Sequence, residues 1–285
     1  KNKLLRKILE RFLISFVISI SIHFIFYIKN SIVVRSIPKS GTQYLRLLIT
    51  NYLVNYDSNL FKEINYFEMH NNYFPNIRNR IFWKQDQLKN NYLQKNILRN
   101  KYSDFIYDHG CVTDRIKFFR PKKMILLYRN PLDHLISLFN YKIKQKATIL
   151  HPNELIEKNL VEFVKNYLFI KTNKNNPNVS ILTYEELIEN PKNVLLRLID
   201  FLDLPLNKKI ISNVINSCSI DNVKKSEIIY EAPIHLEKSN EKQSFISSGN
   251  IGQWKKYFDN NDILLIKKIL KTYNVSLDEF KISID

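Results

Sequence analysis

The sequence predicts an α/β protein in which one central parallel sheet is flanked by helices. Short β-branched or apolar runs alternate along the chain with longer segments whose apolar residues recur at helical spacing. This alternation is typical of a parallel sheet with helices on both faces. The chain has 285 residues, of which 45% are hydrophobic, enough for one large domain with its own core. We expect that single domain over residues 31–285, preceded by a hydrophobic helix over residues 1–30.

Four runs have the composition of buried strands, and the segments between them have the apolar spacing of helices. The expected strands cover residues 31–37, 104–110, 122–128 and 179–183, with a further possible strand at 66–70. The expected helices begin near residue 41 and at residue 131, and cover residues 154–171, 192–202, 206–218 and 262–273. Short helices and loops are expected at 75–101, and an irregular covering loop at 219–248.

The first expected strand runs into a small-residue loop and then a helix, an arrangement with which α/β proteins bind anions. Amides of such a loop and the helix N-terminus point at the anion, and Lys39 adds a full positive charge. An ordinary strand–helix turn is the alternative, because short loops with serine and glycine are common. The candidate anion-binding residues are Pro38, Lys39, Ser40, Gly41, Thr42 and Gln43.

The order of residues in this loop argues against nucleoside-triphosphate chemistry with magnesium. A nucleotide-triphosphatase loop reads G-x-x-x-x-G-K-[ST]. Here Lys39 precedes Gly41 and no glycine lies upstream. No cysteine and histidine spacing of a structural zinc site occurs either, so no metal is expected.

The chain is strongly basic, with a net charge of +17. Such a charge suggests an anionic partner: a nucleotide, nucleic acid, an anionic lipid or a polyanionic sugar. The alternative is a lysine-rich composition whose side chains are simply solvated. The only two cysteines, Cys111 and Cys218, suggest no disulfide framework and fit a reducing compartment.

A second candidate binding motif follows the third expected strand, in the sequence Tyr-Arg-Asn-Pro at residues 128–131. Arg129 ends the strand and Ser137 lies two helical turns into the following helix. An arginine and a hydroxyl so placed can bind one phosphate group. The alternative is that Arg129 merely pairs with Asp133 at the start of the helix.

Four segments together resemble the sulfotransferases that use 3′-phosphoadenylyl sulfate (PAPS). Pro38-Lys39-Ser40-Gly41-Thr42-x-x-Leu45 resembles their 5′-phosphosulfate loop, and the motif from Tyr128 to Ser137 resembles their 3′-phosphate motif. Tyr184-Glu185-Glu186-Leu187-x-x-Asn190-Pro191 and Gly249-x-x-Gly252-x-Trp254-Lys255 resemble the two later family signatures, in the family order. The resemblance implies a P-loop-like sulfotransferase fold, PAPS as co-substrate and PAP (adenosine 3′,5′-bisphosphate) as product.

The resemblance also implies roles for individual residues. Lys39 would assist departure of the nucleotide, and His109 would be the catalytic base for a hydroxyl or amine acceptor. An imidazole is suited to that role, although His109 is also compatible with an ordinary histidine at a strand end. Tyr184 would lie near the adenine. The implied 3′-phosphate contacts are Arg129, Ser137, Ser247, Ser248 and Gly249.

Two positions depart from the family pattern. Tyr107 stands where the cytosolic-type branch carries a lysine, and Ser247-Ser248 stand where it carries Arg-Lys. A PAPS- or PAP-binding protein without transferase activity is therefore the alternative function. A nucleic-acid binder is suggested by charge alone, without a recognised motif, so no nucleic-acid partner is expected. The acceptor, whether a small molecule, a lipid or a glycan, is not encoded in any readable motif.

The first thirty residues resemble a short membrane anchor. Five basic residues precede the apolar run 12–28, which lies at the lower limit for spanning a bilayer. Because the first strand begins only a few residues later, we expect a helix that lies in an anionic membrane surface or against the domain, with the domain in the cytosol. The alternative is a spanning anchor with the domain outside or in a lumen.

Overall fold

The computed structural model describes residues 31–58, 63–64, 105–109, 121–145, 148–149, 151–230 and 249–282. The expected N-terminal helix, the possible strand at 66–70 and the segment 75–101 lie outside these ranges, so the predictions for them stay predictions. No helix within the described ranges combines the length and apolar character needed to cross a membrane.

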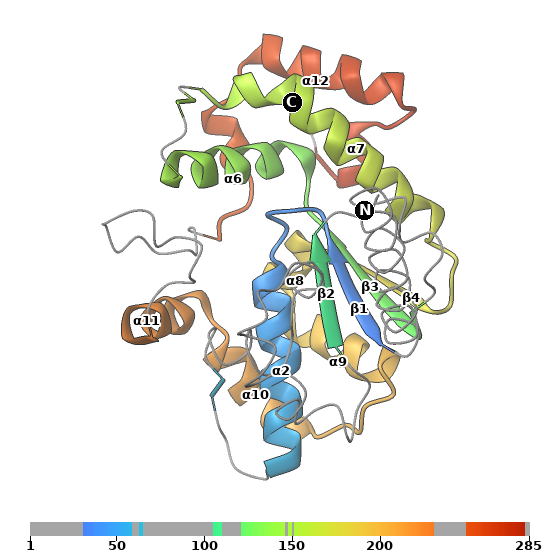
Figure 1. Cartoon of the computed structure of the whole chain (residues 1–285), viewed down its shortest axis with the longest axis vertical. Coiled ribbons are helices and arrows are strands. Elements are labelled where there is room, and N and C mark those ends of the chain that lie inside the picture. Colours follow the sequence, from blue (N-terminus) through green and yellow to red (C-terminus); the bar gives the residue numbers. More distant parts are fainter. Residues whose placement is uncertain are drawn as a thin grey trace, which may run out of the picture.

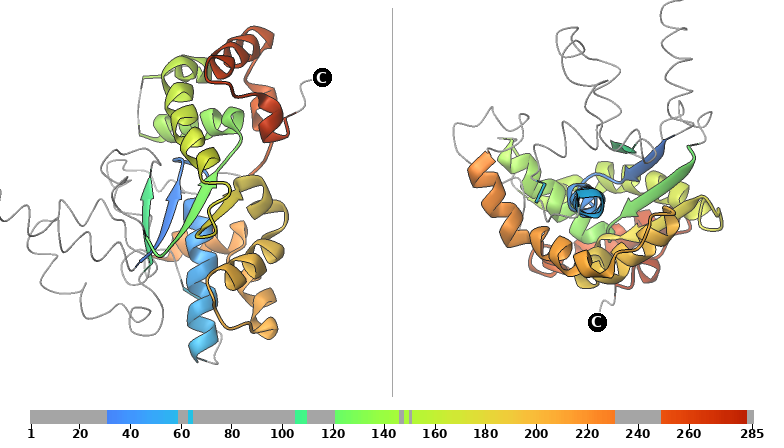
Figure 2. Two further views of the ribbon diagram at one scale, coloured as in Figure 1. Left: turned by 90° about the vertical axis from the view of Figure 1, so that its right-hand side faces the viewer. Right: turned by 90° about the horizontal axis from the view of Figure 1, so that it is seen from below.

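The centre of the fold is a four-stranded parallel sheet in the order β2-β1-β3-β4. The strands are β1 (Ile32–Ser36), β2 (Phe105–His109), β3 (Lys123–Tyr128) and β4 (Val179–Thr183). All four fall within the predicted ranges. Figure 2 (left) shows the strands side by side, with α2 (Thr42–Ser58) on one side of them.

Helices cover both faces of the sheet, as the sequence predicted (Figure 1). Because side chains of a strand alternate between faces, Ile125 and Leu127 of β3 pack into one core, while Met124 and Leu126 pack into the other. The first core is completed by α2, α8 (Tyr184–Glu189), α9 (Pro191–Phe201), α10 (Lys208–Ser217) and α11 (Ile220–Tyr230). The second is completed by α6 (Pro131–Lys144), η3 (Pro152–Leu155), α7 (Ile156–Thr172), η5 (Gln253–Lys256), α12 (Asn260–Thr272) and η6 (Leu277–Phe280).

One prediction about secondary structure was wrong. Residues 219–248 were expected to form an irregular loop, yet residues 220–230 form the helix α11, and residues 231–248 lie outside the described ranges. This helix is polar along most of its length and buries Val223 against the core, so it lacks the apolar stripe by which a helix is found in a sequence.

Candidate functional site

The candidate site lies at the carboxyl edge of the sheet, where β1, β2, β3 and β4 all end. The register places Ser36 of β1 beside both His109 of β2 and Leu127 of β3, and Tyr128 of β3 beside Thr183 of β4. The segments that follow these strands therefore begin next to one another. Ligands of open α/β sheets bind at this edge.

The loop after β1 is closed by contacts at both of its ends. The hydroxyls of Ser36 and Thr42 are hydrogen-bonded to each other, and the Ile37 amide donates to the Leu127 carbonyl at 3.0 Å. Between these ends, Lys39 and Gly41 have positive φ angles of 66° and 88°. A non-glycine residue in this conformation is strained, and such strain is typical of functional loops.

Lys39 lies among other cations, and its side chain is largely withdrawn from solvent. Its Nζ lies 4.3 Å from the centroid of the Tyr141 ring, over the face of α6. Burial first, and then the nearby charges of Lys144 and Arg129, lower the pKa of Lys39 to about 8. Such a lysine is still mainly protonated at pH 7, and an anion bound beside it would raise its pKa.

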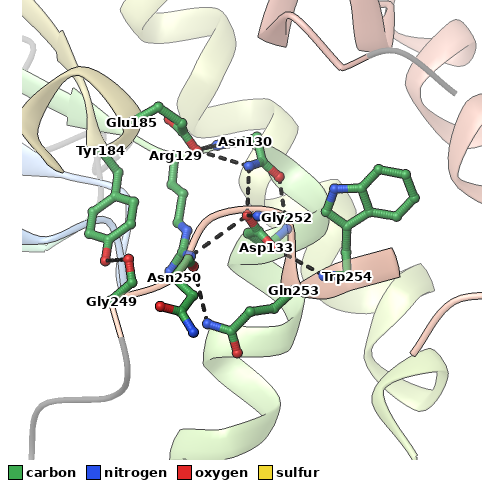
Figure 3. Close-up of polar contacts among 10 residues, drawn as sticks. All are labelled: Arg129, Asn130, Asp133, Tyr184, Glu185, Gly249, Asn250, Gly252, Gln253 and Trp254. Carbon is green, nitrogen blue, oxygen red and sulfur yellow. Dashed lines mark hydrogen bonds and ion pairs between the residues drawn. The ribbon is translucent and has the colours of Figure 1, made fainter. Parts of the chain in front are cut away.

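Arg129, directly after β3, is buried and held on three sides (Figure 3). Its guanidinium lies 4.1 Å from the centroid of the Tyr184 ring, and its Nη2 donates to the Asn250 carbonyl at 2.8 Å. The same nitrogen lies 3.7 Å from Asp133 Oδ2, an ion pair too long to be a hydrogen bond. The simple Arg129–Asp133 pair that the sequence left open therefore exists, but it is only one of several contacts.

The start of α6 fixes the position of Arg129. Asn130 caps the helix by accepting a hydrogen bond from the Asp133 amide at 2.8 Å, and Pro131 occupies the first turn. Asn130 is in turn bound by the Glu185 carboxylate through its backbone and side-chain nitrogens, at 3.1 and 2.9 Å. Ser137 lies one helical turn beyond Asp133, on the same face of α6.

Tyr184 connects three of the predicted motifs. Its ring lies under the Arg129 guanidinium, and a Cβ added to Gly41 would lie 2.7 Å from its Cδ2. Its hydroxyl donates to the Gly249 carbonyl at 3.0 Å (Figure 3). The loop 38–43, the arginine after β3 and the loop that begins at Gly249 therefore meet around this one ring.

Two buried polar atoms at this meeting point have no hydrogen-bond partner within the described residues. They are Ser40 Oγ and Arg129 Nε. Buried polar groups are nearly always paired, and the exceptions call for an explanation. A hydroxyl in the loop 38–43 and a guanidinium N–H are both suited to phosphate oxygens, so the residues present fit a ligand with two phosphate groups.

A histidine that the sequence analysis did not single out lies behind the loop. His134 of α6 is buried, its ring packs 5.0 Å from that of Phe163, and it hydrogen-bonds the backbone of Pro38. Burial, together with the charges of Arg129 and Lys39, lowers the pKa of His134 to about 3. His134 is therefore uncharged at neutral pH, and it contacts the loop through its hydrogen bond to Pro38.

The structure brings together most of the residues that the sequence singled out. The loop 38–43, Arg129, Tyr184 and Gly249 converge, and Ser137 lies on the adjoining face of α6. His109 is placed by its backbone alone, at the carboxyl edge beside Ser36. Ser247 and Ser248 lie outside the described residues. Within the described ranges, no three His, Cys, Asp or Glu side chains are grouped so as to hold a metal ion.

Sequence reasoning missed several residues of this site. Tyr141 and Lys144 approach Lys39 from the far end of α6, and the loop backbone contacts of Asp133 span more than a hundred residues of sequence. The only available signal was spacing: Asp133, Ser137 and Tyr141 follow one another at intervals of four, which places them on one helix face.

Comparison with solved structures confirms the fold. Mouse sulfotransferase SULT7A1 complexed with PAP matches with a TM-score of 0.62 at 18% identity, over 89% of this chain and 88% of that one. Retinol dehydratase in complex with retinol and PAP matches with a TM-score of 0.61 at 18% identity, over 90% of this chain and 84% of that one. At such identities the likeness concerns the fold alone.

Sequence comparison gives the family. The 3-beta-hydroxysteroid sulfotransferase of Cavia porcellus is 27% identical over 153 residues, which are 50% of this chain and about half, 52%, of that protein's length. Cytosolic sulfotransferase 13 of Arabidopsis thaliana is 24% identical over 276 residues, covering 85% of this chain and 75% of that protein. The family model of the sulfotransferase domain matches residues 29–280. The chain belongs to the sulfotransferase family.

Proposed function

We propose that the protein transfers a sulfuryl group from PAPS to a hydroxyl or amine of an acceptor molecule. The observation that carries this proposal is the convergence of the loop 38–43 and Arg129 on Tyr184, with Ser40 Oγ and Arg129 Nε buried and without a partner in the described part of the chain. One of these two atoms lies in the loop after β1 and the other in the residue after β3, which suits a ligand with a phosphate group at each end of the site. Two solved neighbours that share the fold are complexes with PAP.

In the proposed reaction, the acceptor oxygen or nitrogen attacks the sulfur in line with the bond that breaks. That bond joins the sulfur to the bridging oxygen of the 5′-phosphate, which leaves with its electron pair as part of PAP. Lys39 stabilises the negative charge that develops on this oxygen, and the loop amides hold the phosphate. His109 accepts the proton that the acceptor loses. The products are the sulfated acceptor and PAP.

The two ends of the nucleotide are assigned to different elements. The residues Pro38, Lys39, Ser40, Gly41, Thr42 and Gln43 would surround the 5′-phosphosulfate. Arg129 and Ser137, with Ser247, Ser248 and Gly249, would bind the 3′-phosphate, and Tyr184 would lie near the adenine. Arginine suits the 3′-phosphate because its planar fork matches phosphate oxygens.

The test is transfer of radiolabelled sulfate from PAPS to a panel of acceptors. The panel contains hydroxysteroids, amines, simple phenols, lipids and glycans. Hydroxysteroids and amines are included because two relatives are named a 3-beta-hydroxysteroid sulfotransferase and, in Oryctolagus cuniculus, an amine sulfotransferase. Label in at least one acceptor, with PAP formed in equal amount, is the expected result. Tight binding of PAP without transfer to any class would instead favour the non-catalytic binding protein.

A further inference from the structure

The loop that begins at Gly249 is docked onto α6 through its main chain. The Asn250 carbonyl accepts from Arg129 at 2.8 Å, and the amides of Gly252 and Trp254 donate to Asp133 at 2.7 and 3.1 Å (Figure 3). These three contacts use only the main chain of the loop, so they depend on the side chains of Arg129 and Asp133, while the Tyr184 hydroxyl binds Gly249 at the start of the same loop.

Asp133 is the residue at which these contacts meet. Its side chain is fully buried, Oδ2 accepts from Gly252 and from Asn130 Nδ2 at 3.0 Å, and Oδ1 accepts from Trp254. Three hydrogen bonds and the Arg129 guanidinium at 3.7 Å offset the cost of burying this charge. Hydrogen bonds to an ionised acceptor are about twice as strong as neutral ones.

We propose that Asp133 is a positioning residue for recognition of the 3′-phosphate. By fixing the loop, it holds the Asn250 carbonyl where that group orients Arg129 Nη2, and Arg129 Nε, which has no partner within the described residues, is left to bind the ligand. The inference rests on the proposed function, because it takes Arg129 to bind the 3′-phosphate.

A positioning role and a purely electrostatic role predict opposite signs. Asp133 carries a negative charge beside Arg129, so its neutralisation alone would remove repulsion and strengthen binding of a phosphate. If Asp133 instead holds the loop and Arg129 in place, the same substitution weakens binding. In Asp133→Asn, the amide nitrogen would face one of the two backbone N–H donors, which would leave that donor without an acceptor.

The experiment measures the Kd of PAP and of adenosine 5′-monophosphate, which lacks the 3′-phosphate, for the full chain. The affinity ratio is the affinity for PAP divided by the affinity for adenosine 5′-monophosphate. We expect Asp133→Asn to lower this ratio by about tenfold, which corresponds to the loss of one charge-assisted hydrogen bond. Amide hydrogen exchange across residues 249–258 should also become faster. A tighter binding of PAP, or an unchanged ratio, would overturn the positioning role.

Glu185→Gln is the matched control. Glu185 is a half-buried carboxylate near Arg129, but it binds Asn130 and not the loop. Glutamine keeps Oε1, the atom that accepts both hydrogen bonds from Asn130, and removes the charge, so the affinity ratio should not fall by more than about twofold from wild type. A loss equal to that of Asp133→Asn would overturn the inference, because a carboxylate without contacts to the loop would then have the same effect as Asp133.

Arg129→Ala separates this inference from the proposed function. If Arg129→Ala lowers the affinity ratio but Asp133→Asn does not, only the positioning role fails. If Arg129→Ala leaves the ratio unchanged, the 3′-phosphate assignment fails and the inference fails with it. Should Asp133→Asn not fold, Asp133→Glu keeps the charge, moves it by one methylene and is expected to lower the ratio; an unchanged ratio there contradicts the inference.

Discussion

Tyr184 and Gly41 are packed so closely that no side chain fits between them. A Cβ on Gly41 would lie 2.7 Å from Tyr184 Cδ2, and the ring has little freedom to move because it lies under Arg129 and its hydroxyl is bonded to Gly249. Two regions more than a hundred residues apart in sequence thus fix each other, and the loop that carries Lys39 takes its shape from this contact.

Gly41→Ala should therefore weaken PAP binding more than the strain of an alanine at a positive φ would do alone. The φ of 88° costs an alanine about 1–2 kcal/mol, and the clash with Tyr184 adds to it. We expect PAP affinity to fall at least tenfold, measured by isothermal titration calorimetry. Gly252→Ala is the control, because Gly252 has a φ of 78° but no atom within 4 Å of its added Cβ. Equal losses in the two variants would refute the role of the Tyr184 contact.

The binding of PAP should weaken as the pH rises through about 8. The pKa of Lys39 is lowered to about 8 by burial first, and then by Lys144 and Arg129, so the ammonium is present below that pH and is lost above it. Affinity is then highest below pH 8. Measuring the Kd of PAP between pH 7 and 10 in the wild-type protein gives the midpoint pH of this loss of affinity. Bound PAP raises the pKa of Lys39 and so moves this midpoint to higher pH.

Lys144→Ala should move that midpoint to higher pH. Removing a neighbouring positive charge favours the charged form of Lys39 and raises its pKa. Lys142→Ala is the matched control, since Lys142 lies in the same turn of α6 and is not among the groups that lower the pKa of Lys39. A midpoint that moves equally in both variants, or in neither, would show that Lys144 does not act on Lys39.

The four strands were predictable because buried parallel strands are nearly continuous apolar runs, as in residues 123–128. The loop 38–43 and Arg129 were predictable because each lies in one contiguous motif at a strand end. The hydrogen bonds from the Gly252 and Trp254 amides to Asp133 were not predictable. They join α6 to backbone groups 119 and 121 residues away, and every residue except proline has a backbone amide, so the sequence does not indicate which ones bind. Nor could the burial of His134 be inferred from its position in a helix.

His134 should make the fold sensitive to acid. Burial is the main reason that the pKa of His134 falls from the ordinary value of 6.5 to about 3 in the folded state. Between pH 3 and 6.5 the unfolded chain therefore binds a proton at this histidine that the folded chain does not bind. The free energy of unfolding should thus fall as the pH falls from 6.5 towards 3, by about 1.4 kcal/mol per pH unit from this group. Urea unfolding of His134→Gln should show a shallower dependence on pH than wild type.

The control for this prediction is His151→Gln, which removes an exposed histidine. Because this side chain lies outside the core, its removal should leave the wild-type dependence of the free energy of unfolding on pH. If His134→Gln also keeps it, the imidazole does not resist protonation in the folded protein.

The most direct test of sulfuryl transfer is the turnover number of Lys39→Ala with an acceptor found in the panel, measured with PAPS at saturating concentration. Lys39 is assigned to charge that appears only as the bridging oxygen leaves, so kcat should fall by about a hundredfold or more. PAP should still bind, through Arg129 and the remaining loop. A kcat equal to that of wild type would contradict the account.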